Sequence, residues 1–195
     1  FFVDAVSDYK SDFVLFPEYF NAPLMAKFNH LGEAQSIRGL AQYTEEVRDR
    51  FINLAISYNI NIITGSMPYV KEDGGLYNVG FLVRRDGTYE MYEKVHVTPD
   101  EIKSWGLSGG KMVQTFDTDC AKIGILICYD VEFPELSRIM ADQGMQILFV
   151  PFLTDTQNGY SRVRVCAQAR AIENECFVVT AGSVGNVPRV HNLGI

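Results

Sequence analysis

The second half of the chain alternates buried strands with helices, and this order restricts its fold more than any other feature. Three segments are apolar almost throughout, as is typical of strands covered on both faces: 121–130 (AKIGILICYD), 145–152 (MQILFVPF) and 176–182 (CFVVTAG). Two segments of helical character lie between them, 134–144 (PELSRIMADQG) and 159–175 (GYSRVRVCAQARAIENE). This alternation predicts an α/β fold.

The first half also contains buried strands and a helix. Residues 11–18 (SDFVLFPE) and 61–70 (NIITGSMPYV) are each predicted to form one strand. Residues 43–60 have apolar side chains near helical spacing, and Thr44 is the expected N-cap of that helix.

A β-hairpin is predicted between these elements. Residues 76–94 (LYNVGFLVRRDGTYEMYEK) have the pattern of two strands with Asp86-Gly87 at the turn. Residues 97–111 (VTPDEIKSWGLSGGK) are rich in polar residues and glycine and are predicted to be a loop. Because a hairpin is antiparallel, we expect the sheets to be mixed.

Length and composition predict one globular domain. The chain has 195 residues, of which 47% are hydrophobic and 21% are charged. Its net charge of −7 argues against a nucleic acid or an anionic membrane as partner, because both need clustered Lys and Arg. No apolar run approaches the ~18 residues of a membrane span, and no secretory signal is visible.

The cysteines indicate reduced thiols rather than a metal site. They lack metal-binding spacing, and a chain of this length needs no disulfides, so we expect a cytoplasmic compartment. Cys120, Cys166 and Cys176 are predicted to be buried apolar residues. Because the chain begins at Phe1 and ends in HNLGI, we expect a single domain, residues 1–195, of a longer protein.

Three predicted strands end in reactive side chains. Glu18 follows VLFP, Lys94 follows TYEMYE and Cys128 follows KIGILI, and catalytic groups of α/β folds lie where strands end. A carboxylate can take the proton of a thiol and return it to a leaving amine, and an ammonium favours the thiolate. Together they would supply acyl transfer, with a lowered pKa for Cys128. Separately, they also fit a core thiol, a loop acid and a solvated lysine.

The motifs around these residues resemble the nitrilase, or carbon–nitrogen hydrolase, superfamily. Its members have a Glu in a pattern like FPE, a Lys in a pattern like K-x-H-x-x-P-x-E and a Cys in a pattern like C-Y-D-x-x-F-P-E. This chain has LFPEYF at 15–20, EKVHVTPDE at 93–101 and CYDVEFPELSR at 128–138. A fourth match is ARAIENECFVV at 169–179, and the four occur in the family order.

The resemblance implies a four-layer αββα sandwich with two mixed β-sheets, here lacking the first strand and the C-terminal strands. It also implies a homodimer, with no metal and no organic cofactor. The implied reaction is hydrolysis of a small non-peptide amide, or more rarely a nitrile, by a Glu18–Lys94–Cys128 triad. Two alternatives remain: an acyltransferase that uses the same acyl-enzyme with an amine or alcohol, and a binding module without catalysis.

The implied mechanism assigns further roles. Glu18 takes the proton of Cys128 as the sulfur attacks the carbonyl carbon, and a thioester forms. Lys94 and the backbone N–H of Tyr129 are expected to stabilise the oxyanion. Glu101 resembles a second family glutamate that positions Lys94 or binds the substrate nitrogen, although its place in TPDE also fits an exposed loop acid.

Several neighbouring residues are predicted to support the site or the fold. Glu135 either holds the turn after the nucleophile or is a first-turn acid favoured by the helix dipole. Arg170, Glu173 and Asn174 match the fourth family segment, and we expect them to act structurally through an ion pair and a helix cap.

The substrate pocket is the least specified part. Some amidase branches carry an Arg shortly after the cysteine to hold a substrate carboxylate, whereas this chain has Glu132 there, which favours a cationic or neutral amide. Thr154 and Asp155 follow the next strand and are polar candidates for the pocket wall. His96 is an alternative partner for the thiol, in a Cys–His pair.

Overall fold

The computed structural model describes residues 1–187 and 190–192. Its helical elements are α1 (Phe2–Asp8), η1 (Ala22–Phe28), α2 (Glu33–Leu40), η2 (Ala41–Tyr43), α3 (Thr44–Tyr58), the π-helix η3 (Glu101–Trp105), η4 (Cys128–Glu132), α4 (Pro134–Asp142) and α5 (Gln157–Asn174). Its strands are β1 (Phe13–Leu15), β2 (Asn61–Ile63), β3 (Met67–Val70), β4 (Leu76–Val83), β5 (Tyr89–Glu93), β6 (Leu107–Ser108), β7 (Thr115–Asp117), β8 (Lys122–Ile125), β9 (Ile147–Phe152), β10 (Phe177–Gly182), β11 (Gly185–Val187) and β12 (Val190–Asn192).

Most of the strands in the described part of the chain form two sheets. The first has the order β1-β2-β4-β3, and β5 and β6 also pair with β4. Strands β1 and β2 are parallel, whereas β2, β3 and β5 are antiparallel to β4. The second has the order β10-β9-β8-β7, in which only β7 is antiparallel. Both sheets are mixed, as the sequence predicts.

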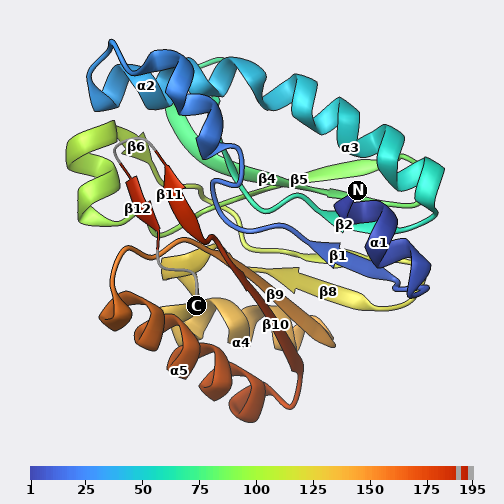
Figure 1. Cartoon of the computed structure of the whole chain (residues 1–195). Helices are drawn as coiled ribbons and strands as arrows, with labels where there is room; N and C mark the ends of the chain where they lie inside the picture. Colours follow the sequence, from blue (N-terminus) through green and yellow to red (C-terminus); the bar gives the residue numbers. More distant parts are fainter. Residues whose placement is uncertain (188–189, 193–195) are drawn as a thin grey trace.

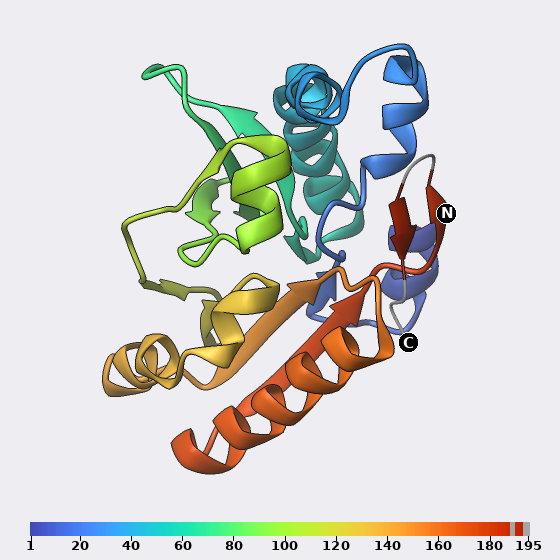
Figure 2. The ribbon, with the colours of Figure 1, turned by 90° about the vertical axis from the view of Figure 1, so that its left-hand side faces the viewer.

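The two sheets face each other between layers of helices. Figure 1 shows α2 and α3 outside the first sheet and α4 and α5 outside the second, and Figure 2 shows the same layers from the side. Ile63 and Leu82 of the first sheet share one buried cluster with Ile123 and Phe149 of the second. A second cluster joins the first sheet to α1 and α3. The predicted αββα sandwich is confirmed.

Local signals in the sequence fix several element ends. The Thr156 hydroxyl accepts a hydrogen bond from Gly159 N–H at 3.0 Å and caps α5. Between β4 and β5, Gly87 has a φ of +84°, and Thr88 N–H donates to the Asp86 carboxylate at 2.9 Å. Asn59 ends α3 in the left-handed region. The predicted hairpin is confirmed.

Residues 61–70 do not form a single strand. The chain leaves β2, turns at Gly65, where φ is +68°, and then begins β3. Thr44 is the first residue of α3 rather than its N-cap, and its hydroxyl donates to the Pro68 carbonyl at 2.6 Å. Both predictions were wrong because a local pattern does not show tertiary contacts. The Thr44 hydroxyl bonds to Pro68, and Gly65 turns where it packs closely against Pro17.

Residues 97–111 are not simply a loop. They contain η3 and β6, and β6 pairs in parallel with β4. Glu101, the first residue of η3, accepts hydrogen bonds from the Thr98 N–H at 2.8 Å and from the Thr98 hydroxyl at 3.0 Å. This local ring of hydrogen bonds orders a segment whose composition predicts a loop.

Two glycines allow the backbone to pass close to the loop that carries Glu18. A Cβ at Gly65 would lie 2.0 Å from the Pro17 carbonyl oxygen, and one at Gly80 would lie 2.1 Å from the Gly65 carbonyl oxygen. The Tyr92 hydroxyl donates a hydrogen bond to that same Gly65 oxygen. This packing fixes the path of the chain immediately before Glu18.

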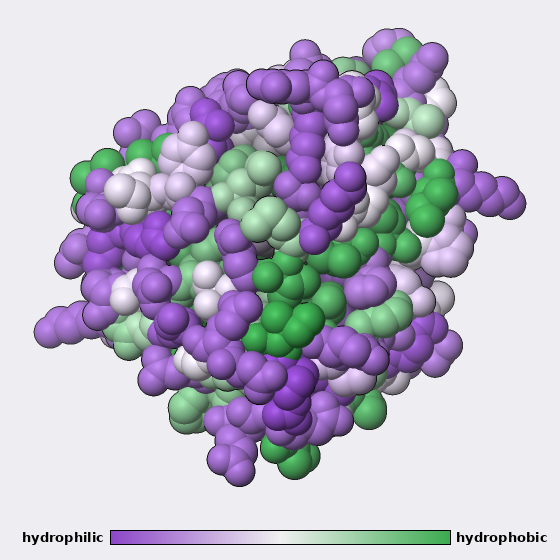
Figure 3. Space-filling model, turned by 180° about the vertical axis from the view of Figure 1, so that it is seen from behind, coloured by the Kyte–Doolittle hydropathy of each residue, from purple (hydrophilic) through white to green (hydrophobic). Residues whose placement is uncertain are grey.

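The outer surface is mainly polar. Figure 3 shows the molecule from behind, where apolar residues gather near the centre of a largely polar face. A cavity of about 440 Å³ lies between α5 and β10 and is lined by residues of both, such as Tyr160 and Val178. Cys128 is not among the described residues that line it, so this cavity is separate from the site below.

Gly80→Ala is expected to lower the free energy of unfolding by about 2 kcal/mol or more, because the new Cβ meets a backbone oxygen. Gly32→Ala is the control, since a Cβ there meets nothing within 4 Å, and it should cost less than about 1 kcal/mol. Urea unfolding of both variants measures the difference. Equal effects would contradict the close approach.

Candidate active site

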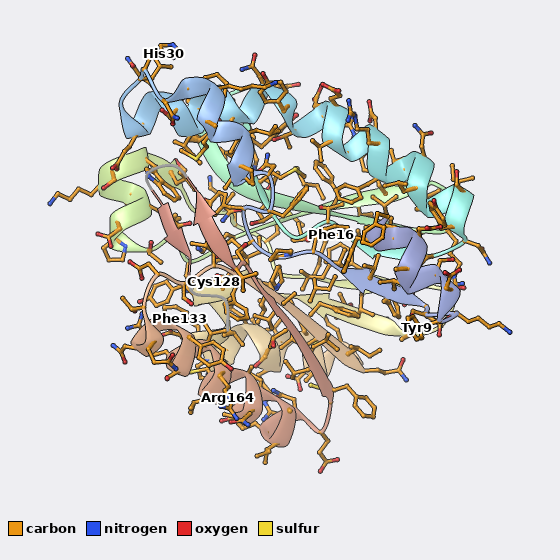
Figure 4. The ribbon with its side chains drawn as sticks, in the orientation of Figure 1. Tyr9, Phe16, His30, Cys128, Phe133 and Arg164 are labelled. Carbon is orange, nitrogen blue, oxygen red and sulfur yellow. The ribbon has the colours of Figure 1, made fainter. Side chains whose placement is uncertain are left out.

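Glu18, Lys94 and Cys128 lie together near three strand ends. Glu18 lies shortly after β1, Lys94 directly follows β5, and Cys128 begins η4 after β8. Their exposed fractions are 2%, 2% and 7%. Figure 4 labels Cys128 in the interior between the two helical layers.

The Lys94 ammonium lies between two carboxylates. It donates to Glu18 Oε1 at 2.8 Å and to both carboxylate oxygens of Glu101 at 2.9 Å. Glu101 is itself only 6% exposed, so it belongs to this buried cluster and is not an exposed loop acid. Buried charges of either sign are costly unless they are paired, and here each has a partner.

The orientation of the Glu18 carboxylate is fixed by additional partners. Oε1 accepts a hydrogen bond from Asn78 Nδ2 at 2.9 Å, and Oε2 accepts one from the Leu153 N–H at 2.8 Å. The Ser183 hydroxyl donates to the Glu18 backbone carbonyl at 2.8 Å. Groups from β4, from the end of β9 and from the residue after β10 therefore hold this side chain.

Cys128 lies at a strained turn. Its φ is +50°, in the left-handed region that a non-glycine residue rarely adopts. The thiol donates to the Leu153 carbonyl at 3.5 Å, and the charge of the nearby Glu18 carboxylate acts on its pKa. Leu153 thus gives its N–H to the carboxylate and its carbonyl to the thiol, which holds the two side chains next to each other.

The surroundings of Cys128 favour the protonated form of its thiol. Burial raises its pKa well above the ordinary value, the charge of Glu18 raises the pKa further, and the charge of Lys94 only partly opposes them. The predicted lowering of this pKa was wrong because it counted the cation but neither the burial nor the carboxylates. Attack by the sulfur therefore needs a base that removes the proton.

The two carboxyl groups differ in basicity. Burial raises the pKa of Glu18, and Lys94 opposes this only in part. Burial alone would also raise the pKa of Glu101, but Lys94 and the hydrogen bonds from Thr98 outweigh it and lower that pKa. The same two carboxylates overcome the effect of burial on Lys94 and raise its pKa well above the ordinary value. Glu18 is therefore the better proton acceptor of the two.

Tyr19 adds a neutral contact to the cluster. It follows Glu18 with a φ of +49°, and its hydroxyl donates to Glu101 Oε1 at 3.1 Å. Burial raises the Tyr19 pKa well above its ordinary value, and the charge of Glu101 adds to this effect. The Trp105 ring packs edge-on against Tyr19 at 5.4 Å between centroids. Tyr19 therefore connects η3 to the loop that carries Glu18.

The other predicted site residues have varied surroundings. The Tyr129 ring packs edge-on against Phe133 at 5.0 Å, and the proposed role of the Tyr129 N–H stays a prediction. Glu135 is exposed in the first turn of α4. Thr154 is buried and Asp155 is exposed at the end of β9.

Glu132 has a partner within the chain. Its carboxylate accepts from Arg162 Nε of α5 at 3.3 Å. This ion pair compensates the charge that led us to expect a cationic or neutral amide. Because Glu132 is paired, its charge no longer supports the expectation of a cationic or neutral amide.

Two contributors were missed at the level of sequence. Asn78 donates to Glu18 across a separation of 60 residues, and nothing in its local sequence marks it. Asp130 is 1% exposed and accepts hydrogen bonds from the backbone, and its place in the CYD motif could have identified it. His96 Nδ1 lies 3.1 Å from Asp130 Oδ1, so the contact shown for His96 is with this acid rather than with Cys128.

The fourth family segment forms the predicted ion pair. Arg170 donates to the carbonyls of Val131 and Glu132 at 3.0 and 3.2 Å and pairs with Glu173 at 2.8 Å. Asn174 Nδ2 donates to the Arg170 carbonyl at 3.0 Å. These contacts tie α5 to the turn that carries Cys128.

Three further findings concern the other cysteines, metal-binding groups and membrane-spanning helices. Cys120 is exposed, which contradicts its predicted burial, and Cys166 and Cys176 are partly buried. The described part of the chain contains no group of three or more His, Cys, Asp or Glu residues that could hold a metal ion. No helix within it is both long and apolar enough to cross a membrane.

Comparison with known proteins identifies the family. Residues 2–195 match the sequence profile of the family described as Carbon-nitrogen hydrolase. The chain belongs to this family. This agrees with the resemblance found in the four sequence motifs.

Curated carbon–nitrogen hydrolase relatives are longer than this chain. The probable hydrolase YhcX of Bacillus subtilis is 49% identical over 195 residues, which are 100% of this chain and 38% of that protein. The human omega-amidase NIT2 is 33% identical over 181 residues, covering 86% of this chain and 61% of that protein. The chain thus spans less than two thirds of either relative.

Solved structures of carbon–nitrogen hydrolases share the fold. A carbon–nitrogen hydrolase from Helicobacter pylori superposes with a TM-score of 0.82 at 19% identity, covering 98% of this chain and 73% of that one. The NitFhit protein of C. elegans has a TM-score of 0.82 at 26% identity, covering 97% of this chain and 48% of that one. Both comparisons support the four-layer sandwich.

Lys94→Met is expected to lower the free energy of unfolding by about 3–5 kcal/mol at about pH 7, because two buried carboxylates lose their cation. Without the cation, the pKa of Glu101 in the folded state rises above the unfolded value, and the already raised pKa of Glu18 rises further. The variant should then gain stability as the pH falls through these raised values, and its deficit should shrink towards about pH 5. Urea unfolding at both pH values measures this.

Lys94→Met/Glu101→Gln is the matched variant, since it removes one of the two uncompensated charges. It should recover part of the lost stability at neutral pH. A deficit that is the same at both pH values and in both variants would show that the three charges are not coupled.

Proposed function

We propose that this protein hydrolyses a small, non-peptide amide through a thioester on Cys128. The observation that carries the proposal is the buried Glu18 carboxylate, which accepts a hydrogen bond from the Lys94 ammonium and, through Leu153, is held next to the Cys128 thiol. A protonated thiol beside a base of raised pKa and a fixed cation are the components that acyl transfer needs. The family and its omega-amidase relative support an amide as substrate.

The first step forms the thioester. The sulfur of Cys128 bonds to the carbonyl carbon while its proton moves to Glu18, and the carbonyl π electrons move to the oxygen. The C–N bond then breaks, and Glu18 gives the proton to the leaving nitrogen. Because the same carboxyl accepts and donates, its raised pKa suits both directions.

Lys94 supplies charge during this step. Its ammonium is already fixed by Glu18 and Glu101, so it needs little rearrangement when the oxyanion develops. The backbone N–H of Tyr129, directly after the nucleophile, is the proposed second donor. Glu101 keeps its lowered pKa and stays ionised, which holds Lys94 protonated throughout.

The second step releases the acid. Water replaces the amine, Glu18 takes a proton from it, and the oxygen bonds to the thioester carbon. Collapse of the intermediate breaks the C–S bond, and the proton on Glu18 returns to the sulfur. The site ends with Cys128 protonated and Glu18 ionised, as it began.

Cys128→Ala is expected to lower ammonia release from a panel of small amides by at least about a thousandfold, because no thioester can form. Cys120→Ala is the matched control, since its thiol is exposed and it should keep the parent rate. Ammonia is measured in solution, and intact mass detects an acyl adduct on the parent protein.

Two outcomes would change the assignment. Ammonia release that persists in Cys128→Ala would contradict a cysteine nucleophile. An acyl adduct that clears only after an amine is added would show transfer to that amine instead of hydrolysis.

A further inference from the structure

Asp130 links two segments of the site through a single carboxylate. It is 1% exposed. Oδ1 accepts a hydrogen bond from the His96 N–H at 2.7 Å. Oδ2 accepts one from the Val95 N–H at 3.2 Å and one from the Ile127 N–H at 3.3 Å. One oxygen atom therefore bridges two distant parts of the chain.

These two parts carry the cation and the nucleophile. Val95 directly follows Lys94, and Ile127 directly precedes Cys128. Strand β5 has ended before Lys94 and β8 has ended before Ile127, so neither backbone position lies within a strand of its sheet. Because β5 and β8 belong to different sheets, the carboxylate joins the two sheets at the site.

We propose that Asp130 is a positioning residue that sets the distance between the Lys94 ammonium and the Cys128 sulfur. This rests on the function proposed above and adds a residue that acts only through the backbone of its neighbours. Asp130 fixes Val95 and Ile127 by the same atom, so Lys94 and Cys128 keep one relative position while the acyl group is transferred.

A carboxylate suits this role better than an amide. An ionised carboxylate only accepts hydrogen bonds, and Asp130 faces three backbone N–H donors. In Asp130→Asn, an amide N–H would replace one of the two oxygens. Whichever way the amide is turned, its N–H faces either the Val95 and Ile127 N–H groups or the His96 N–H, and two donors cannot bond to each other. The substitution keeps the size of the side chain but breaks at least one contact.

The His96 ring provides a matched control. The ring contacts Oδ1 and stacks on Phe133 with centroids 3.6 Å apart, while the bridge is made by Oδ2. His96→Ala removes the ring but keeps the backbone N–H that donates to Asp130. It should therefore leave the bridge between Val95 and Ile127 intact.

The test uses 4-nitrophenyl acetate as an acylating probe of the parent protein, Asp130→Asn, His96→Ala and Cys128→Ala. Stopped-flow release of nitrophenolate gives a burst amplitude, which counts competent sites, and a rate constant for acylation. We expect Asp130→Asn to keep most of the amplitude and to lose at least tenfold in the rate constant. Its half-saturating probe concentration should stay within threefold, and His96→Ala should keep its rate constant within threefold.

Three results separate this proposal from its alternatives. A smaller amplitude with an unchanged rate constant in Asp130→Asn would mean that Asp130 serves only folding, which overturns the proposal. An equal loss of rate in His96→Ala would show that the effect runs through the ring, which also overturns it. A parent protein that releases nitrophenolate no faster than Cys128→Ala, in the burst and in the steady state, would instead reject the proposed thioester chemistry.

Hydrogen exchange of the native protein tests the bridge without any substrate and without a variant that must fold. The Val95 and Ile127 amides should both be protected at neutral pH. If either one exchanges at the rate of an open chain, the bridge does not exist and the proposal is overturned, whatever the acylation assay shows.

Discussion

The rest of the site depends on the ion pairs that the buried Lys94 ammonium makes with two carboxylates. The ammonium lies within hydrogen-bond distance of Glu18 and Glu101, and neither carboxylate could stay ionised at such depth without a cation. Glu18 comes from the end of β1 and Glu101 from η3, so one charge holds a strand end and a π-helix together. The close packing of Gly65 against Pro17 fixes the chain before Glu18, and the hydrogen bonds from Thr98 fix Glu101. Both acids are therefore held around the ammonium.

The same burial decides how the site does its chemistry. Removing water from Cys128 favours the neutral thiol more strongly than Lys94 favours the thiolate. In the proposed mechanism the nucleophile is thus stored with its proton, near a carboxyl whose own pKa is raised. In that mechanism, proton transfer to Glu18 is coupled to attack by the sulfur, and the cation held by Glu18 and Glu101 stabilises the oxyanion. In an exposed cysteine near a lysine, by contrast, the cation would lower the thiol pKa and favour the thiolate.

Sequence reasoning identifies the strand ends but not what surrounds them. Continuous apolar runs predict β8 and β9, and the Asp86-Gly87 turn predicts the hairpin that ends at Lys94, because these signals are local. The turn at Gly65 depends on a close backbone approach, and Asn78 depends on a partner 60 residues away, so neither is visible locally. The direction of the Cys128 pKa shift depends on burial, which a list of neighbouring residue types does not contain.

The protonation state of Cys128 at rest tests this account most directly. The ultraviolet absorbance of a thiolate can be compared between the parent protein and Cys128→Ser as the pH rises. The account predicts no thiolate signal from Cys128 at neutral pH and a signal only above the ordinary thiol pKa of about 8.5. A full thiolate signal at neutral pH would contradict it, because the cation would then outweigh burial and Glu18 would have no proton to accept.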